Sequence, residues 1–472
     1  MRHYSYVVLG AGLSGLTTAR ELSRAKPGEV LVLEREDQPG GLCRTITRQG
    51  ARYDLGSHRI HPSIPDNIAR YLCDLSRTKW LINPRDGKLR LRRQYIGYPI
   101  NSLGFLKGLG LLESAACALS LSWARLKSTL SPASANLCWN YETYLKRYAG
   151  ARAYRLFYEP YARKVWGCEP SQITTEAVKK RISMTCPLEI LRAIFRGGGN
   201  GHKYYYPPNG IGSLADALSS EVCDSGSTLV MRVADIRIQV EGSARWITYS
   251  DGTSRHTVSF DKLVTTIPLD DATALLDQGN ALQSIRQAMR WGGLRVAYVH
   301  VRQQPLITGE TSYFPELEYI FGRVSIPRRF SPAMQPDDTF TSFVCEIPCT
   351  EHDAVWQLSP GELGDRCLAD LVKAGLLTCP QNLPGRDFVV NLPKVYPLYD
   401  LTWSDTVKRQ LEYLNAQYPF VYASGRAGLF LHCNLDHSVR IGLEAARAVL
   451  DGVSSRDWHR HTNAFRELKL RD

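Results

Sequence analysis

Residues 6–34 read YVVLGAGLSGLTTARELSRAKPGEVLVLE, and this stretch decides the fold of the first part of the chain. Its apolar start, residues 6–9, has the length of a buried parallel strand, and a segment with helical periodicity follows it. Gly10, Gly12 and Gly15 stand between the two at the spacing G-x-G-x-x-G. In such a motif the first glycine permits a tight turn, the second lets the backbone approach a pyrophosphate, and the third lets the helix pack against the strand.

A second strand is expected at residues 30–33, and Glu34 follows it directly. In this position a carboxylate can accept hydrogen bonds from the hydroxyl groups of an adenosine ribose. The free N–H groups at the start of the intervening helix point at the phosphates of the same ligand. Strand, glycines, helix, strand and acid in this order predict a Rossmann-type domain that binds a dinucleotide.

The residues after Glu34 indicate which dinucleotide binds. Pro39-Gly40-Gly41 is followed by Arg44, and a second glycine turn with a basic residue is typical of FAD-binding domains such as those of glutathione reductase and the amine oxidases. Nicotinamide dehydrogenases usually lack this feature. We therefore expect FAD as the cofactor, with Gly41 in the turn and Arg44 beside the pyrophosphate, where a guanidinium can pair with two phosphate oxygens. NAD(P)H is a candidate external reductant.

The loop Asp54-Leu55-Gly56-Ser57-His58 comes shortly after the cofactor motif. In flavoenzymes of this kind such a loop passes beside the isoalloxazine ring, and small residues such as Ser57 are needed because the backbone approaches the ring closely. His58 is accordingly a candidate for contact with the flavin and for catalysis. The alternative is a histidine with a purely structural role.

Composition points to an ordinary globular enzyme. The 472 residues are 44% hydrophobic and 22% charged. The most apolar stretch, residues 103–123, contains Lys107 and Glu113, which favours an amphipathic helix over a membrane span. No export signal is evident after Met1, and none of the twelve cysteines forms a C-x-x-C pair. We expect a cytoplasmic protein with reduced thiols and without a metal site.

The formal net charge of +12 implies an anionic ligand. Basic residues are scattered, with one denser run at residues 88–93, and no nucleic-acid-recognition module accompanies them, so nucleic acid is not an expected partner. A basic cleft that binds FAD and an anionic small-molecule substrate accounts for the charge. The run at residues 88–93 leaves two alternatives open, a solvated surface and a peripheral membrane contact. The sequence does not indicate the oligomeric state.

The rest of the chain alternates between helical and strand patterns. We expect a small strand pair at residues 80–82 and 89–91, a mainly helical region at 102–218 with a turn at 204–213, strands at 228–240, 246–249, 263–266, 297–301 and 340–346, and helices at 360–374 and 439–450. These elements predict an α/β protein with α+β insertions. The Rossmann-type FAD-binding domain is expected in three parts (1–80, 201–270 and 401–472), with a mainly helical substrate or cap domain (81–200) and a mixed-sheet substrate domain over the flavin (271–400).

Two further segments are candidates for the site. Residues 158–167 are dense in aromatic and charged side chains, which usually line a site rather than fill a dry core. Near the C-terminus the polar residues Asn434, Asp436, His437 and Ser438 can cap the helix expected at 439–450. The dipole of this helix favours flavin carbonyl or ribityl oxygens at its N-terminus.

Taken together, these motifs resemble those of the UDP-galactopyranose mutases, above all the eukaryotic-type branch, and of the related amine-oxidase-like and protoporphyrinogen-oxidase-like flavoproteins. In the mutases a Lys-Val-Trp motif is followed by an arginine that contacts the substrate diphosphate, and here Lys164-Val165-Trp166 leads to Arg181. A Tyr-Phe-Pro-Glu segment with a second such arginine is also typical, and here Tyr313-Phe314-Pro315-Glu316 leads to Arg323. The resemblance implies that Arg181 and Arg323 are catalytic and hold one diphosphate from two sides.

The resemblance also implies further contacts. It makes Tyr98, Asn101, Trp166, Tyr313, Tyr396 and His432 substrate-binding candidates, and Arg426, Asn434, Asp436, His437 and Ser438 cofactor-binding candidates in the segment that lies over the flavin. This chain departs from the mutases in several places. Ile100 and Asn101 replace an aromatic residue and a glutamine in the uridine-binding stretch, and Phe330 and His432 stand where the mutases tend to have tyrosines. Each lost contact is worth on the order of 1 kcal/mol, so the preferred nucleotide or sugar is expected to differ.

Two functions follow as hypotheses. The resemblance implies a redox-neutral pyranose/furanose interconversion of a nucleoside-diphosphate sugar, in which N5 of the reduced flavin attacks the anomeric carbon and the nucleotide leaves. The alternative is a net oxidoreductase of the amine-oxidase or protoporphyrinogen-oxidase type. A non-catalytic FAD-bound scaffold is a third alternative. The arginine pair favours an anionic diphosphate substrate, because a neutral amine or a porphyrin would leave it without a use.

Overall fold

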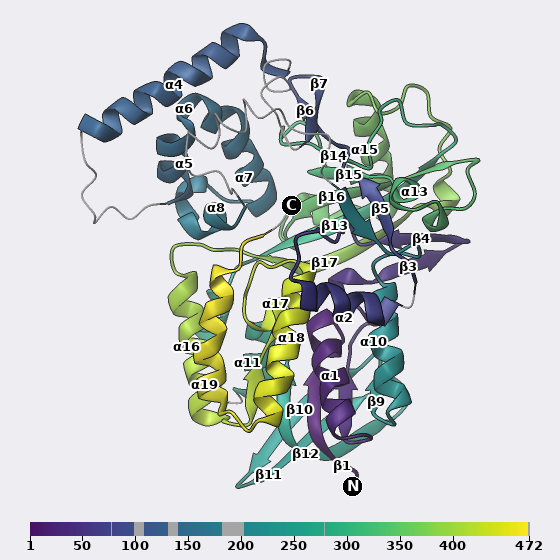
Figure 1. Cartoon of the computed structure of the whole chain (residues 1–472), viewed down its shortest axis with the longest axis vertical. Coiled ribbons are helices and arrows are strands. Elements are labelled where there is room, and N and C mark those ends of the chain that lie inside the picture. The colour runs from purple at the N-terminus through teal and green to yellow at the C-terminus, as the bar shows by residue number, and fades with distance from the viewer. Residues whose placement is uncertain (77, 99–107, 131–139, 182–202, 278, 471–472) are drawn as a thin grey trace.

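The structure, a computed structural model, describes residues 1–76, 78–98, 108–130, 140–181, 203–277 and 279–470. Two seven-stranded sheets dominate it, one below the other in Figure 1, and a group of helices stands beside the upper sheet. The mixed α/β architecture with a Rossmann-type part confirms the predicted fold class.

The lower sheet contains the Rossmann-type core. Strand β1 pairs in parallel with β2 on one side and with β12 on the other, and every residue of β2 is buried. Burial on both faces explains why these strands read as continuous apolar runs. The predicted strands at 6–9 and 30–33 are confirmed. The sheet consists of β10 (Ala234–Glu241), β11 (Ala244–Ser250), β12 (Arg255–Thr265), β1 (His3–Leu9), β2 (Val30–Leu33) and β9 (Thr228–Val230) in this order, with β18 (Val421–Ala423) paired to β12.

Helices cover the lower sheet, and the first of them begins within the glycine motif. The first of them begins directly after Gly12, at Leu13, and packs on the last long helix of the chain. Figure 1 shows these helices as a layer in front of the strands. The helices around this sheet are α1 (Leu13–Ala25), α2 (Asp66–Ser76), α10 (Ser213–Asp224), α11 (Leu269–Leu276), α12 (Gln283–Gln287), α16 (Trp403–Gln417), α17 (Gly425–Gly428), α18 (Leu435–Leu450) and α19 (Ser455–Thr462).

The upper sheet is mixed, and its long strand β13 (Trp291–Val301), the second strand from one edge, is almost entirely buried. Leu363, Cys367 and Leu371 of α15 (Pro360–Lys373) share one hydrophobic core with this strand. The predicted strands at 297–301 and 340–346 and the helix at 360–374 are thereby confirmed. The strand order is β17 (Phe388–Pro397), β13 (Trp291–Val301), β16 (Thr341–Cys349), β15 (Arg323–Ser325), β14 (Thr311–Tyr313), β6 (Gly87–Leu91) and β7 (Gln94–Tyr98).

A group of helices forms the upper left part of Figure 1 and confirms helical structure for the described residues 111–130 and 140–181. One of these helices begins at Asn140, whose side chain accepts a hydrogen bond from the backbone of Thr143, and another ends at Gly167 in a left-handed conformation. We call this group the helical unit: α4 (Leu111–Leu130), α5 (Tyr141–Ala149), α6 (Ala151–Ala153), the π-helical turn Tyr154–Tyr158, α7 (Glu159–Trp166) and α8 (Thr175–Arg181).

The remaining described elements are short. They are the strands β3 (Thr45–Arg48), β4 (Ala51–Asp54), β5 (Leu81–Pro84) and β8 (Lys203–Tyr206), the helices α13 (Pro327–Phe330) and α14 (Ala354–Gln357), and 3-10 turns at Gly41–Cys43, Pro170–Gln172, Pro332–Met334, Pro384–Arg386 and Asn463–Glu467. None of the helices in the described part of the chain has the length and apolarity to span a bilayer.

The predicted pairing of residues 80–82 with 89–91 is wrong. Strand β5 pairs with β8, and β6 pairs with β7 and β14. The turn between β6 and β7 is Arg92-Arg93, and both residues have positive φ angles of 46° and 70°. Such a two-residue turn matches the twist of a hairpin, so the backbone of β6 forms hydrogen bonds with β7, its neighbour in sequence. Strand β5 therefore pairs with β8 instead.

Two boundaries also differ from the prediction. The turn expected at 204–213 begins only after Tyr206, since β8 alternates between buried and more exposed tyrosines and forms a strand. The last long helix begins at Leu435 rather than Val439, because Asn434 forms a capping box with His437. Asp436, His437 and Ser438 therefore belong to the first turn of α18 and do not precede it.

Candidate active site

A cavity of about 980 Å³ lies where the lower sheet, the upper sheet and the helical unit meet. This volume is at the upper end of the range for small-molecule and cofactor sites. The lining residues come from all three parts of the chain. We call the lining at residues 9–14, 33–44 and 425–438 the fingerprint wall, and Arg59, Arg85, Tyr98, Tyr313 and Arg323 the basic wall.

The three glycines of the fingerprint have different surroundings. Gly10 has φ of 96°, which favours glycine, and a Cβ atom on Gly15 would lie 2.0 Å from the carbonyl oxygen of Gly10. A Cβ atom on Gly12 would meet nothing within 4 Å, although Gly12 lines the cavity. Gly10 and Gly15 are therefore required by the turn and by the packing of α1, whereas Gly12 leaves open space toward a ligand.

Glu34 ends β2 on the fingerprint wall and is 8% exposed. Its carboxylate accepts hydrogen bonds from the backbone N–H groups of Ala11 at 2.7 Å and of Glu36 at 3.0 Å. Each carboxylate oxygen accepts one of these hydrogen bonds, and a carboxylate oxygen can accept a second one. The fixed carboxylate can therefore accept hydrogen bonds from a ribose.

The second glycine turn lies against the first. Gly40 and Gly41 have φ angles of 110° and 55°, and the N–H of Gly40 donates to the carbonyl of Ala11 at 2.8 Å. Arg44 is buried behind this turn, with Nη1 at 3.0 Å from Glu36 and with a buried Nε that has no hydrogen-bond partner. A buried N–H group without a partner requires an explanation, and an anionic ligand in the cavity supplies one. The fingerprint wall thus fits a dinucleotide.

The C-terminal segment supplies the rest of the fingerprint wall. Arg426 donates from Nη1 to the carbonyl of Cys433 at 2.7 Å and from Nη2 to that of Val395 at 3.0 Å, so it joins two backbone segments beside the cavity. Its Nε is buried without a partner. Asn434 and Ser438 line the cavity. Asp436 and His437 do not line it, because both are buried in the first turn of α18, with 3.6 Å between the Asp436 carboxylate and Nε2 of His437.

His58 lines the cavity together with Ser57. Burial and the neighbouring guanidinium groups of Arg323, Arg426 and Arg59 lower the pKa of His58 to about 3. The imidazole is therefore neutral near pH 7, with one donor and one acceptor nitrogen. Its Nδ1 is buried without a hydrogen-bond partner and is thus available to a ligand.

Glu346 holds the loop before His58. Gly56 has φ of 123°, a Cβ atom there would lie 2.9 Å from the Glu346 carboxylate, and the N–H of Ser57 donates to that carboxylate at 3.1 Å. The group that lies close to Gly56 is thus the Glu346 side chain of β16. Glu346 is not among the residues predicted from the sequence, although a lone acid in the apolar strand Thr341–Cys349 is a visible signal.

Arg323 forms a buried pair with the same carboxylate. It lies opposite Glu346 in the register of β15 and β16, and Nε donates to Oε1 at 2.6 Å and Nη2 to Oε2 at 2.5 Å. Glu346 has 4% of its side chain exposed and Arg323 has 28%. The carboxylate fixes the guanidinium at the cavity surface and raises the pKa of Arg323, so its positive charge is permanent.

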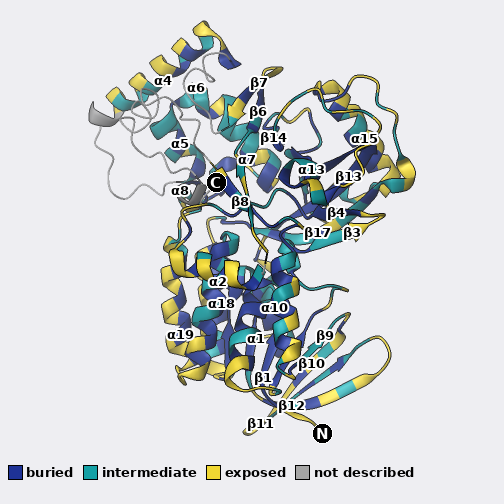
Figure 2. Cartoon of the chain, turned by 45° about the vertical axis from the view of Figure 1, so that its right-hand side comes forward, coloured by how far each residue is buried: buried dark blue, intermediate teal, exposed yellow. Residues whose placement is uncertain are grey.

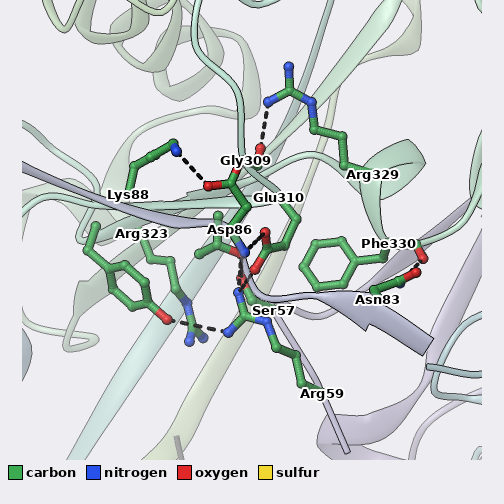
Figure 3. Close-up of polar contacts among 12 residues, drawn as sticks. Ser57, Arg59, Asn83, Asp86, Lys88, Gly309, Glu310, Arg323, Arg329 and Phe330 are labelled. Atoms are coloured by element: carbon green, nitrogen blue, oxygen red, sulfur yellow. Dashed lines mark hydrogen bonds and ion pairs between the residues drawn. The ribbon is translucent and has the colours of Figure 1, made fainter. Parts of the chain in front are cut away.

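A second charged pair lies beside the first, and Figure 3 shows it in the centre of the view. Arg59 donates from Nη2 to Glu310 at 2.8 Å and to Thr311 at 2.7 Å. Glu310 is almost fully buried and also accepts a hydrogen bond from the N–H of Asp86 at 3.1 Å. These contacts tie the residue after His58 to β14. Neither Arg59 nor Glu310 was predicted from the sequence.

Arg85 differs from Arg59 and Arg323 in its surroundings. Its guanidinium lies over the ring of Tyr98 at 5.2 Å, and the rings of Tyr98 and Tyr313 are 4.6 Å apart. Nε and Nη2 of Arg85 are buried without hydrogen-bond partners. Among the described residues Arg85 has no ion pair with an acid. The basic wall therefore contains a guanidinium that forms no ion pair with a carboxylate in the described ranges of the chain.

The segment at residues 158–167 lies at the cavity. Tyr158, Tyr161, Val165 and Trp166 line it, and Trp166 packs edge-on against Tyr141 at 5.3 Å. Lys164 points the other way and donates to the carbonyls of Phe314, Glu316 and Phe321. The Lys-Val-Trp motif thus joins the helical unit to the loop between β14 and β15.

The other predicted site residues are placed as follows. Tyr396 and His432 line the cavity with their rings stacked 5.7 Å apart. Phe330 does not line it and packs on Tyr206 in a small core. Asn101 and the side chain of Arg181 lie outside the described residues, although Ala177 of the same helix lines the cavity. The described residues contain no group of three or more His, Cys, Asp or Glu side chains that could hold a metal ion.

Comparison with known proteins agrees with this geometry. Residues 8–75 match the family model described as NAD(P)-binding Rossmann-like domain, and residues 144–450 match the model described as Flavin containing amine oxidoreductase. Two solved structures share the fold. A reduced UDP-galactopyranose mutase has a TM-score of 0.80 at 22% identity over 95% of this chain and 94% of its own. Wild-type putrescine oxidase bound to putrescine has a TM-score of 0.60 at 16% identity over 95% and 99%.

Similarity to curated proteins is more partial. The "Putative flavin-containing monoamine oxidase AofH" of Mycobacterium tuberculosis is 26% identical over 259 residues, which are 52% of this chain and 54% of that protein. The all-trans-retinol 13,14-reductase of Rattus norvegicus is 40% identical over 68 residues, 14% of this chain and 11% of that protein. The chain thus matches about half of the first protein and about a tenth of the second. Because the second family model covers most of the chain, the protein belongs to the flavin containing amine oxidoreductase family.

Proposed function

We propose that the protein is an FAD-dependent enzyme that interconverts ring forms of a nucleoside-diphosphate sugar without net oxidation. The observation that carries this proposal is the basic wall, where Arg85 has no acidic partner among the described residues and lies over the ring of Tyr98, which packs on Tyr313. A diphosphate supplies the missing negative charge, and a nucleobase or sugar can stack on the aromatic rings. A protonated amine would meet like charge here instead.

The residues of the fingerprint wall fit FAD. Gly10 and Gly12 would accommodate its pyrophosphate, Glu34 would accept hydrogen bonds from its ribose, and the unpartnered Nε of Arg44 would donate to a phosphate oxygen. FAD supplies the covalent or redox chemistry at the sugar carbon. The protein itself would bind, orient and stabilise charge.

Arg323 is well placed for charge stabilisation. Glu346 fixes its guanidinium before any ligand arrives, so no reorganisation is needed when negative charge develops on a departing diphosphate. Arg181 is proposed as the second cation on the same diphosphate, since its helix contributes Ala177 to the cavity wall. Neutral His58, with its free Nδ1, is proposed to hold the cofactor or the substrate by a hydrogen bond rather than by charge.

The fold comparison adds support, because a UDP-galactopyranose mutase shares the fold over 95% of this chain. Family membership supports a second candidate, a net oxidoreductase that removes hydride from its substrate, and the resemblance to a monoamine oxidase over 52% of the chain favours the same candidate. The two candidates differ in whether an oxidant is consumed.

The test is an assay of the purified holoenzyme, reduced with dithionite under anaerobic conditions, against a panel of UDP- and dTDP-sugars. Isomeric products are followed by chromatography, and oxygen consumption is followed in parallel under air. Turnover that requires reduced flavin and consumes no oxidant supports the proposal. Stoichiometric oxidant use with a dehydrogenated product supports the second candidate instead.

Arginine variants connect the assay to the site. Arg181→Ala and Arg323→Ala should each lower kcat/KM by about a hundredfold with FAD content unchanged, on the scale of losing one electrostatic donor. Arg323→Lys should recover little, because an ammonium loses the planar two-bond geometry. Arg409→Ala, an exposed arginine on α16, is the matched control and should retain full activity. Full activity in both cavity variants would exclude the proposed diphosphate clamp.

A further inference from the structure

The outer face of α4 carries a row of exposed apolar side chains. Leu112, Leu119 and Trp123 are 90%, 72% and 69% exposed, and Leu126 continues the row at 50%. Their spacing of seven, four and three residues places them on one face of a helix. The opposite face is buried at Ser114 and Cys117, where α4 packs on α5 and α6. Figure 2 shows exposed residues along the outer side of α4.

This row is unlike the other exposed apolar residues in the described part of the chain. Leu306, Leu317 and Leu401 are 56%, 58% and 62% exposed and lie in three separate loops. Single exposed apolar residues are normal, whereas a contiguous apolar face marks an interaction surface. A tryptophan within such a face is typical of a helix that lies at the boundary between lipid and water.

Charge indicates the chemistry of the partner. Residues 87–181 contain sixteen lysines and arginines, five glutamates and no aspartate, whereas the whole chain has a net charge of +12. Almost all of the excess positive charge therefore belongs to the segment that carries α4. Near the start of α4, Arg92 and Arg152 are both about half exposed and share Glu113 as their partner. At the other end, Lys127 is exposed.

We infer that this face of α4 docks on the surface of a bilayer that contains anionic lipid. The leucines and Trp123 would enter the boundary between headgroups and acyl chains, and the surrounding arginines and lysines would attract the headgroups. A second copy of the chain fits less well, because a two-fold contact through α4 would bring two strongly positive segments together. The helix lies on the membrane in this arrangement and does not cross it, in agreement with the lack of a spanning helix among the described residues.

Docking through α4 does not involve the cavity, which is lined by other helices of the helical unit. Tyr141, Phe157 and Trp166 face the cavity, whereas α4 packs behind them on the outer side. The membrane contact is therefore separate from the proposed chemistry, and variants on the exposed face of α4 should not change flavin content or turnover.

The experiment is flotation of the holoprotein with vesicles of phosphatidylcholine alone and with vesicles that also contain phosphatidylglycerol. The wild type should float only with the anionic vesicles, and less so at high salt, because exposed charges are screened. Leu119→Glu/Trp123→Glu should weaken the partition by about a hundredfold, since two large apolar groups leave the boundary. Lys127→Glu should weaken it by about fivefold.

Leu317→Glu/Leu401→Glu is the matched control, because it replaces two comparably exposed apolar residues elsewhere and should float like the wild type. Circular dichroism and flavin content verify that each variant is folded. The inference is overturned if the wild type does not bind anionic vesicles at low salt, or if the α4 variant binds as the wild type does. It is also overturned if light scattering shows a wild-type dimer that only the α4 variant breaks while neither protein floats.

Discussion

The fingerprint wall of the cavity is shaped by backbone, whereas the basic wall is shaped by pairs of charged side chains. At the fingerprint wall, a Cβ atom on Gly15 would lie 2.0 Å from the carbonyl oxygen of Gly10, and two backbone N–H groups donate to the carboxylate of Glu34. These backbone contacts leave one conformation for each residue. In the basic wall, Arg59 reaches Glu310 across 251 residues of sequence, and Ser57 reaches Glu346 across 289. Within residues 9–44 the first wall is therefore built from segments that are close in the chain, whereas the contacts of the second wall join distant segments.

This difference has a physical consequence. A cavity wall formed by the backbone can bind the same ligand in many related proteins. Glycine turns and helix N-termini recognise a pyrophosphate independently of the side chains elsewhere in the chain. A wall made of side-chain pairs can change its ligand by single substitutions. The cofactor thus follows from the family, whereas in the proposed function the substrate depends on Arg85, Arg323 and their neighbours.

The largest expected effect tests the backbone wall. Gly15→Val should lower the free energy of unfolding by about 3 kcal/mol or more and abolish flavin binding, because its Cβ would overlap the carbonyl of Gly10. Gly12→Val should lose flavin as well but unfold at nearly the wild-type denaturant concentration, since its Cβ meets no atom. Chemical denaturation of both variants measures this difference. Equal stabilities would show that the two glycines do not have distinct roles.

The next effect concerns the pair that fixes Arg323. Glu346→Ala removes the acceptor of four hydrogen bonds and leaves a guanidinium without its partner, so the free energy of unfolding should fall by about 2 kcal/mol. Because Arg323 is then mobile, kcat/KM should fall as well. In a double-mutant cycle with Arg323→Ala the two losses should be strongly non-additive. Additive losses would mean that Glu346 does not position Arg323.

The third effect concerns pH, and it is the smallest of the three over a step of one pH unit. His58 has a pKa of about 3 in the folded protein against an ordinary value of 6.5, so between these values the unfolded chain binds more protons than the folded one. The free energy of unfolding should therefore decrease as pH falls from about 6.5 toward 3, by up to about 1 kcal/mol per pH unit from this residue. His58→Asn should flatten the profile by one proton. Denaturation of the flavin-free protein across this range measures the slope, and identical slopes for His58→Asn and wild type would contradict the assigned neutral state.

The same difference between the walls decides what the sequence could predict. The two strands that flank the first helix follow from apolar runs and local turns. The strand at 30–33 was predicted to the residue, whereas the first strand begins at His3 and not at Tyr6. The partner of β5 was not predicted, because it is supplied by residues 203–206, far along the chain. Hydrophobic periodicity records which face of a strand is buried but not which strand lies beside it.

For the site, local motifs led to Glu34, Arg44 and His58, all of which line the cavity. Arg85, Glu310 and Glu346 were missed, because a buried charge is informative only once its surroundings are known. Two of the three are acids whose partners lie more than 200 residues away. Arg85 lies in a stretch that reads as an ordinary polar loop, and only the ring of Tyr98 and its own unpartnered nitrogens distinguish it.

The most direct test of the central claim is an anaerobic spectral titration of the reduced holoprotein with UDP-sugars and, separately, of the oxidised holoprotein with putrescine. A nucleotide sugar should perturb the flavin spectrum, and Arg85→Ala and Arg323→Ala should each raise its apparent Kd by at least about tenfold at unchanged flavin content, because each removes a cation of the basic wall. Putrescine should leave the oxidised flavin unreduced. Reduction of the flavin by the amine, together with no response to any nucleotide sugar, would contradict the account.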